Sequence, residues 1–87
     1  MWYVYIIKSI IKDFIYIGST NDLKTRLEEH NSGLSKSTKP YKPFSLEAYI
    51  AVKTENKARE LEKYLKTGSG KAILKKRILT DKASVKA

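Results

Sequence analysis

The 87-residue sequence contains no cysteine, which excludes disulfide bonds and metal sites built from thiolates. It also lacks a hydrophobic run long enough to cross a bilayer, because Lys8 interrupts the apolar stretch at residues 2–7. No basic segment precedes that stretch, so it does not have the pattern of a signal peptide. From these absences we expect a cytoplasmic protein without a membrane partner.

Acidic residues are scarce, since nine Asp and Glu stand against 18 Lys and Arg and leave a net charge of +9. Basic and acidic side chains are equal in number in residues 1–33, so the whole excess lies in residues 34–87. Such an uneven excess favours a polyanionic partner, nucleic acid above all. On charge alone, the excess could also serve solubility, or RNA binding by a ribosome-associated protein.

The apolar pattern predicts one α/β (α+β) domain over residues 1–80, followed by a frayed tail at 81–87. Strands are recognised by aromatic and β-branched runs or by alternation, and helices by their caps and their apolar stripe. The expected elements are strands at 2–7, 14–17 and 45–52 and helices at 22–31, 54–66 and 72–79, with a basic surface loop at 34–44. Their order, ββαβαα, predicts a three-stranded, largely antiparallel sheet flanked by helices.

Several local signals fix the expected boundaries. Thr20 or Asn21 is a good N-cap for the first helix, and Gly68-Ser69-Gly70 is expected to break the second. The first two strands form a hairpin. A four-residue loop would set Tyr5 opposite Tyr16, whereas a shift of one residue would send them to opposite faces.

Three polar side chains fall on helix faces that should be apolar. At 100° per residue, His30 lies within the stripe of Leu23 and Leu27, and Arg26 borders that stripe one turn before His30. On the next long helix Glu62 points inward. Burying an unpaired carboxylate costs several kcal/mol, so Glu62 requires a basic residue, a metal or a hydrogen-bond network.

Simpler roles for these residues remain open. A histidine in an apolar stripe can be a hydrogen-bonded core residue, and an inward Glu62 can pair with Arg26. Tyrosines in strands are common for their packing alone. The set is more informative than its members, because the tyrosines, Arg26, His30 and Glu62 could all converge on one side of a small sheet.

The order of these residues resembles the GIY-YIG nuclease family over nearly the whole chain. Tyr3-Val4-Tyr5 stands at the first triplet and Tyr16-Ile17-Gly18 matches the second. The first triplet departs from the family pattern because Tyr3 replaces its glycine. The positions that also resemble small stand-alone members, similar to the N-terminal nuclease domain of a bacterial excision-repair endonuclease, are Ala58, Glu62, Leu65 and Lys66.

The resemblance implies a phosphodiester hydrolase that uses one Mg²⁺ (or Mn²⁺) ion held by Glu62. Arg26 would bind a non-bridging phosphate oxygen, and Tyr5 would act as general base on the attacking water. Tyr16 would orient water or phosphate, and His30 would relay the proton from the tyrosine. Two residues are expected to shape the site, Gly18 by leaving room for the substrate and Asn31 as the nearest amide. No asparagine follows Glu62, where some members of the family have one.

Basic side chains outside this set would hold phosphates that flank the cut, without reading sequence. They are Lys36, Lys39, Lys42, Lys71, Lys75, Lys76 and Arg77. The expected substrate is DNA rather than RNA, in repair or nucleic-acid processing, with a possible partner in a repair complex and an oligomeric state that the sequence does not define. Two alternatives stay open: a non-catalytic nucleic-acid-binding module that keeps the nuclease fold, and a protein-interaction domain.

Overall fold

Strands and helices follow one another in the predicted order along residues 1–78, the part of the chain that the computed structural model describes. The elements are β1 (Trp2–Ser9), β2 (Ile15–Thr20), α1 (Leu23–Ser32), the 3₁₀ helix η1 (Lys39–Tyr41), β3 (Phe44–Val52), α2 (Glu55–Leu65), α3 (Gly68–Ile73) and the π-helical turn η2 (Leu74–Ile78). The α+β class is therefore confirmed. No helix among these residues is long and apolar enough to span a membrane.

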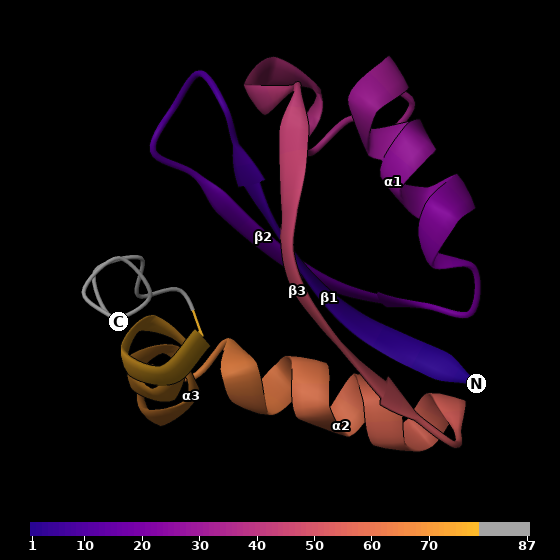
Figure 1. Cartoon of the computed structure of the whole chain (residues 1–87), viewed down its shortest axis with the longest axis vertical. Coiled ribbons are helices and arrows are strands. Elements are labelled where there is room, and N and C mark those ends of the chain that lie inside the picture. The colour runs from indigo at the N-terminus through magenta and orange to yellow at the C-terminus, as the bar shows by residue number, and fades with distance from the viewer. Residues whose placement is uncertain (79–87) are drawn as a thin grey trace, which may run out of the picture.

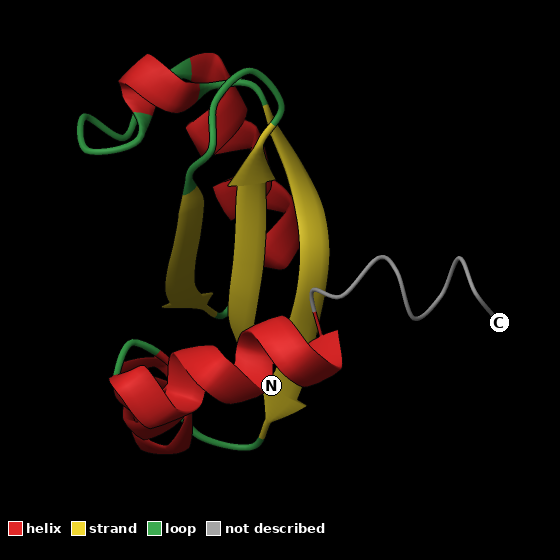
Figure 2. Cartoon of the chain, turned by 90° about the vertical axis from the view of Figure 1, so that its left-hand side faces the viewer, coloured by secondary structure: helices red, strands yellow, loops and turns green. Residues whose placement is uncertain are grey.

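β1 lies at the centre of the three-stranded sheet and pairs antiparallel with both neighbours, in the order β2-β1-β3. Figures 1 and 2 together show α1 on one face of the sheet and the α2–α3 segment on the other. β2 and β3 are the edge strands. Because successive side chains of β1 point to opposite faces, this one strand supplies both helix layers with core residues.

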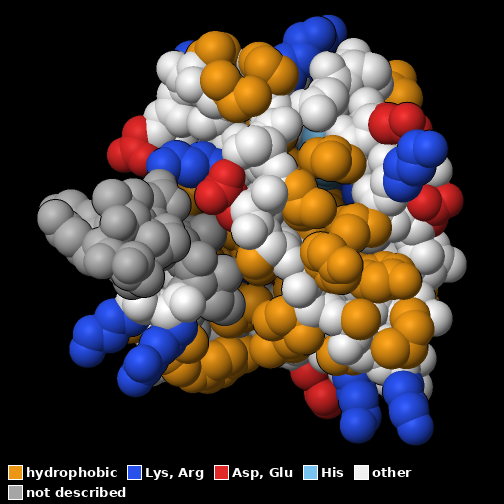
Figure 3. Space-filling view, viewed as in Figure 1, with side chains coloured by type: hydrophobic (Ala, Val, Ile, Leu, Met, Phe, Trp, Pro, Cys, Tyr) orange, Lys and Arg blue, Asp and Glu red, His pale blue; other side chains and the backbone are white. Residues whose placement is uncertain are grey.

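The two faces are not covered equally. Tyr5 of β1 packs in a cluster with Leu23 and Leu27 of α1, which defines the α1 face. Tyr49 of β3 is paired directly with Tyr5 and so lies on the same face, yet it is 54% exposed. Figure 3 shows hydrophobic side chains gathered at the surface on the side seen in this view, with basic and acidic side chains around them. α1 therefore leaves part of its face open.

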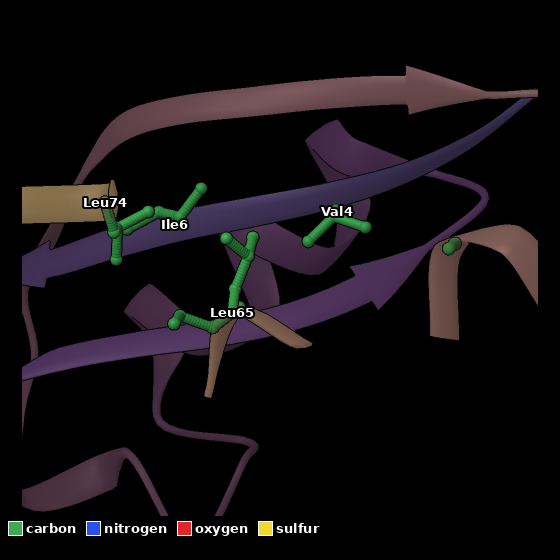
Figure 4. Close-up of a cluster of buried hydrophobic side chains, with 6 residues drawn as sticks. Val4, Ile6, Leu65 and Leu74 are labelled. Atoms are coloured by element: carbon green, nitrogen blue, oxygen red, sulfur yellow. The ribbon is translucent and has the colours of Figure 1, made fainter. Parts of the chain in front are cut away.

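The opposite face is closed by α2 and the segment that follows it. Val4 and Ile6 of β1 point into this layer and are fully buried. Leu65 of α2 and Leu74 pack against them, as Figure 4 shows. Full burial of such an aliphatic side chain contributes about 1.5–3 kcal/mol. This cluster holds the long second helix in a fixed position under the sheet.

The register of the hairpin differs from the predicted one by two residues. Tyr5 is paired with Gly18, and Tyr16 is paired with Ile7. The two tyrosines remain on one face because the shift is even. The connection is longer than four residues because the Ser9 hydroxyl accepts hydrogen bonds from the backbone N–H groups of Ile11 and Lys12, which holds the turn open.

β2 also continues through Gly18 to Thr20, whereas Gly18 was expected to end it. A glycine is required here because the side chain of Tyr5 occupies the space that a side chain at position 18 would need. A Cβ at Gly18 would lie 2.5 Å from the hydroxyl of Tyr5. The space in front of Gly18 is therefore filled by Tyr5, which corrects the expectation that it is left open for the substrate.

β3 contains a bulge that the alternating pattern did not predict. The pairing with β1 shifts between Ile6 and Ile7, so that Ile6 faces Ala48 while Ile7 faces Leu46. An extra residue in one strand reverses the side on which the following side chains point. Leu46 consequently packs in the α1 cluster and Ala48 in the α2 cluster, although regular alternation would place two residues at this spacing on one side.

The third helix begins four residues before the predicted Ala72. The Thr67 side chain accepts a hydrogen bond from the N–H of Gly70 at 3.2 Å and caps α3, so Gly68 and Gly70 lie in its first turn rather than in a break. Gly70 is buried against the backbone carbonyl of Tyr64, where a Cβ would collide. The predicted helix end at 79 and the tail at 81–87 lie outside the described residues.

Candidate active site

The hydroxyl of Tyr5 lies at the centre of a buried polar cluster on the α1 face. It is 2.9 Å from Nε2 of His30 and accepts a hydrogen bond from Nε of Arg26 at 3.3 Å. On its other side, the His30 ring places Nδ1 2.8 Å from the hydroxyl of Thr38. His30 and Thr38 are completely buried and Tyr5 is 2% exposed. The structure therefore joins three predicted residues and one that was not predicted.

The hydrogen bonds fix where the protons lie. Burial, and then the nearby Arg26 cation, lowers the pKa of His30 to about 4, so its ring carries a single proton at neutral pH. Thr38 donates its hydroxyl proton to the carbonyl of Ser35 and can only accept from the ring. The single ring proton is thus on Nδ1, assigned from this network. Nε2 is left free to accept the proton of Tyr5.

Burial raises the pKa of Tyr5 to about 12, although the hydrogen bond from Arg26 partly offsets this effect. Tyr5 therefore keeps its proton at neutral pH. A phenol held between a cationic donor and a neutral imidazole acceptor can pass its proton to the imidazole while it takes one from a water. The direction of these hydrogen bonds, from Arg26 to Tyr5 and from Tyr5 to His30, is the one that a general base needs.

Arg26 is held in place by Glu29, one turn further along α1. Their side chains form an ion pair of 2.8 Å, and the two side chains are about one third exposed. The hydrogen bond to Glu29 raises the pKa of Arg26 further, so the guanidinium is always charged. Of its five N–H donors, one is directed at Tyr5 and one at Glu29. The remaining donors are available for a phosphate.

α1 is fixed at both ends. Asp22, rather than Thr20 or Asn21, is the N-cap, and its carboxylate accepts from the N–H and the hydroxyl of Thr25. Gly33 ends the helix with a φ of 85°, a left-handed conformation that favours glycine. These two ends set the rotation of α1 that aims His30 into the core.

Tyr16 and Gly18 complete the tyrosine side of the site. The ring of Tyr16 lies 6.2 Å from that of Tyr5 and 5.0 Å from the imidazole of His30, measured between centroids. Because Gly18 has no side chain, the ring of Tyr5 can lie over β2 next to Tyr16. The two triplet tyrosines are therefore diagonal neighbours around one histidine.

Glu62 reaches this region from the opposite layer. Its carboxylate accepts from the hydroxyl of Ser19 at 2.7 Å and from Lys66 at 2.7 Å. Ser19 belongs to the edge strand β2, and the Lys66 ammonium lies 6.0 Å from the ring centre of Tyr16. The Glu62–Lys66 pair thus lies at the free edge of β2, beside the tyrosines, and it is not paired with Arg26.

The carboxylate of Glu62 is ionised although it is only 22% exposed. Partial burial alone would raise its pKa, but the hydrogen bonds from Lys66 and Ser19 outweigh burial and hold the pKa below its usual value. Each carboxylate oxygen has a second lone pair free for a cation. Within residues 1–78, no group of three or more acidic or histidine side chains is placed to hold a metal. One ionised carboxylate fits Mg²⁺, which keeps several of its waters.

Asn31 lies next to His30 on α1 and binds the start of β3. Its side-chain oxygen accepts from the N–H of Phe44 at 2.6 Å, and its amide nitrogen donates to the carbonyl of the same residue. The ring of Phe44 packs edge-on against the imidazole of His30, with centroids 5.9 Å apart. Asn31 therefore acts on the site through Phe44 and does not contact the polar cluster.

The predicted basic residues are all exposed and lie in two places. One group follows α1 and the other belongs to α3 and η2, and among residues 1–78 neither group is hydrogen-bonded to the Tyr5 cluster. Lys71 and Lys75 line a cavity of about 260 Å³ against β2, together with Asp13, Ile15, Ile17 and Leu74. The first group is Lys36, Lys39 and Lys42, and the second is Lys71, Lys75, Lys76 and Arg77.

Three functional contacts were missed by sequence reasoning. Glu29 stands at i,i+3 from Arg26, a spacing that does signal a helical ion pair. Ser19 follows the second triplet and could have been paired with an inward carboxylate. Thr38 had no signal, because it lies in a loop with ordinary polar composition and reaches His30 only through the tertiary fold.

An α+β domain that brings a buried tyrosine–histidine pair, an arginine and an ionised carboxylate to one edge of a small sheet has the construction of a nuclease-type catalytic domain. The family model of the GIY-YIG catalytic domain matches residues 1–77, and the chain belongs to this family. No curated protein and no solved structure matches it. Membership implies a nucleic-acid substrate and, in general, a divalent metal.

Proposed function

We propose that this chain is a Mg²⁺-dependent endonuclease that hydrolyses phosphodiester bonds in DNA. The observation that carries the proposal is the hydroxyl of Tyr5, buried between the guanidinium of Arg26 and the unprotonated Nε2 of His30. A module that only binds nucleic acid has no need of a phenol hydrogen-bonded to a buried neutral histidine, because exposed lysines alone can hold phosphates.

The hydrolysis would begin with a water at the substrate phosphorus. As the water oxygen forms its bond to phosphorus, its proton passes to the oxygen of Tyr5, and the phenolic proton of Tyr5 passes to Nε2 of His30. The bond from phosphorus to the leaving oxygen breaks, and that oxygen takes a proton from solvent. The imidazolium then returns its proton to Tyr5 while Tyr5 releases the proton that came from the water to solvent, so the enzyme is restored.

Substrate binding would itself prepare His30 for this step. The cation of Arg26 is one reason why the pKa of His30 lies at about 4. A phosphate bound to the free N–H donors of Arg26 offsets that positive charge, so the pKa of His30 rises toward its usual value when the substrate is present. The relay is therefore most basic when a phosphodiester occupies the site.

Glu62 is the residue that would hold Mg²⁺, and the ion would supply polarisation of the phosphate and of the leaving oxygen. Lys66 donates a hydrogen bond to the same carboxylate and keeps it ionised. Arg26 would stabilise the charge that develops on the non-bridging oxygens. Tyr16, beside both His30 and Lys66, would orient the water or the phosphate.

The exposed lysines would hold the flanking phosphates without reading bases. This favours a nuclease with weak sequence preference that acts in repair or processing, with specificity for structure supplied by the site itself or by a partner in a repair complex. A non-catalytic binding module is the second candidate, and the net charge of +9 is the observation that favours it. Such a module would bind the same oligonucleotides without cleaving any of them.

Cleavage assays test the proposal. End-labelled single-stranded, duplex and branched DNA and single-stranded RNA are incubated with Mg²⁺ and with wild type, Glu62→Gln or Glu60→Gln. Glu60 is a matched control because it is an exposed carboxylate on the same helix. We expect cleavage by wild type and Glu60→Gln only. Salt-sensitive binding without cleavage of any substrate would contradict the enzyme and support the binding module.

A further inference from the structure

The open part of the α1 face suggests how the substrate is chosen. We propose that Tyr3 and Tyr49 form a stacking platform for an unpaired nucleobase, so that the preferred substrate has single-stranded DNA next to the bond that is cut. This inference rests on the proposed nuclease function and names its substrate class. Tyr3 is also the residue that replaces the glycine of the family's first triplet.

The register places the platform directly beside the candidate site. Tyr49 is paired with Tyr5 across β1 and β3, and Tyr3 precedes Tyr5 by two positions on the same face. The rings of Tyr3 and Tyr49 meet edge to face, with centroids 5.8 Å apart and planes at 69°. The two tyrosines of the platform therefore lie beside the polar cluster on the same face of the sheet.

The platform is accessible although its neighbour is not. Tyr49 is 54% exposed, compared with 2% for Tyr5. Ala51, which is paired with Tyr3 on this face, is exposed and too small to cover either ring. Figure 3 shows a group of hydrophobic side chains exposed on the side of the molecule seen in this view, with both basic and acidic side chains around it. An exposed aromatic surface on the same face as the Arg26 guanidinium fits a ligand that has flat rings and an anionic backbone.

Distances along the sheet agree with a short stretch of nucleic acid. Neighbouring strands lie about 4.8 Å apart, so Tyr49 on β3 is separated by about that distance from its partner Tyr5 on β1. Stacked bases repeat at about 3.4 Å along one strand. A base on the platform would thus belong to a nucleotide about one or two positions from the phosphate at the Tyr5 cluster. In a duplex this base is covered by its neighbours, so the platform selects unpaired DNA.

Fluorescence of an oligonucleotide that contains 2-aminopurine tests the platform without cleavage. Wild type, Tyr49→Leu, Tyr49→Phe and Tyr64→Leu are titrated without divalent metal into the single-stranded oligonucleotide and its duplex. Tyr64 is the matched control, an exposed tyrosine on α2 at 43%. We expect quenching on binding and a Kd about tenfold higher for Tyr49→Leu with single strands only, since a lost base–aromatic stack weakens binding by about that factor. Tyr49→Phe and Tyr64→Leu should behave as wild type.

Equal affinity of wild type and Tyr49→Leu for single strands would overturn the platform, and such a result would point to a protein ligand for this face. An equal loss for single strands and duplex would overturn it as well. The two proposals fail separately. Stacking without cleavage would contradict the nuclease proposal and support the platform. Cleavage that does not depend on Tyr49 would contradict the platform and support the nuclease.

Discussion

At the scale of single residues, the proposed chemistry depends on the orientation of one imidazole. His30 is useful as a proton acceptor only while Nδ1 carries its proton and Nε2 faces Tyr5. Thr38 holds that tautomer because it accepts from Nδ1 and donates to Ser35. A positioning residue in a loop therefore controls a group on a helix.

Replacement of Thr38 tests this role. Thr38→Val keeps the volume but leaves a buried N–H of His30 without an acceptor, at a cost of about 1–3 kcal/mol. We expect kcat to fall at least tenfold while KM changes little, and the nitrogen chemical shifts of His30 to show a mixture of tautomers. Thr38→Ser, which restores the hydroxyl, should recover both properties. A kcat for Thr38→Val equal to that of wild type would remove Thr38 from the relay.

The sequence predicted the members of the site better than their contacts. Arg26, His30 and Glu62 could be singled out because each is a polar residue on or beside a helix stripe that should be apolar, whereas Tyr5 was singled out only by the resemblance of its triplet to the family pattern. The partners of these residues could not be found in the same way. Thr38 and Ser19 are ordinary polar residues, and only the tertiary fold brings their hydroxyls to His30 and Glu62.

At the scale of elements, boundaries followed local chemistry and register did not. α2 begins after its N-cap Thr54 and α1 ends before its C-cap Gly33, each within one residue of the predicted bound, because a cap acts within one turn. The predicted register of the hairpin was wrong and the bulge in β3 was not predicted, because both features depend on contacts between distant segments. The Ser9 hydroxyl, for example, donates to the carbonyl of Tyr41, 32 residues further along the chain.

The join between α2 and α3 gives a test with an internal control. Gly70 lies against the carbonyl of Tyr64, whereas Gly68 has open space where its Cβ would be. Gly70→Ala should therefore destabilise the fold by about 2 kcal/mol or more, in the manner of an overpacked core. Gly68→Ala should leave the stability unchanged or raise it by up to about 1 kcal/mol, because alanine lowers the conformational entropy of the unfolded chain. Urea unfolding measures both, and equal effects of the two substitutions would contradict the helix packing.

At the scale of the whole molecule, the buried, unprotonated His30 makes the stability of the fold sensitive to acid. The pKa of His30 is about 4 when folded and about 6.5 when unfolded. Because the unfolded chain binds the proton more readily, stability is complete above pH 6.5 and decreases as pH falls toward 4. The loss from this group is at most about 3 kcal/mol.

Urea unfolding at several pH values between 7.5 and 4.5 checks this prediction. Wild type should lose stability steadily over that range, with most of the loss below pH 6.5. His30→Gln, which cannot titrate, should show a much smaller dependence on pH although it is less stable at pH 7.5. Parallel curves for the two proteins would mean that the imidazole titrates normally in the folded state.

The molecule as a whole combines a buried cluster of Tyr5, His30 and Thr38 with an exposed, basic surface. The two edges of the sheet are used differently: Ser19 of β2 holds Glu62 of α2 at the candidate metal position, and β3 carries the exposed Tyr49. β1 lies between them and supplies Tyr5 to the first and Tyr3 to the second. One short strand thus connects the proposed chemistry with the proposed choice of substrate.

The central claim is that the hydroxyl of Tyr5 activates the water, and single-turnover cleavage by Tyr5→Phe tests it most directly. Tyr64→Phe serves as the control, because it removes an exposed phenol outside the site. We predict that Tyr5→Phe cleaves single-stranded DNA about 10²- to 10⁴-fold more slowly than wild type, the usual contribution of a general base, and binds it with affinity within about threefold. Cleavage by Tyr5→Phe at the wild-type rate would contradict this role of Tyr5.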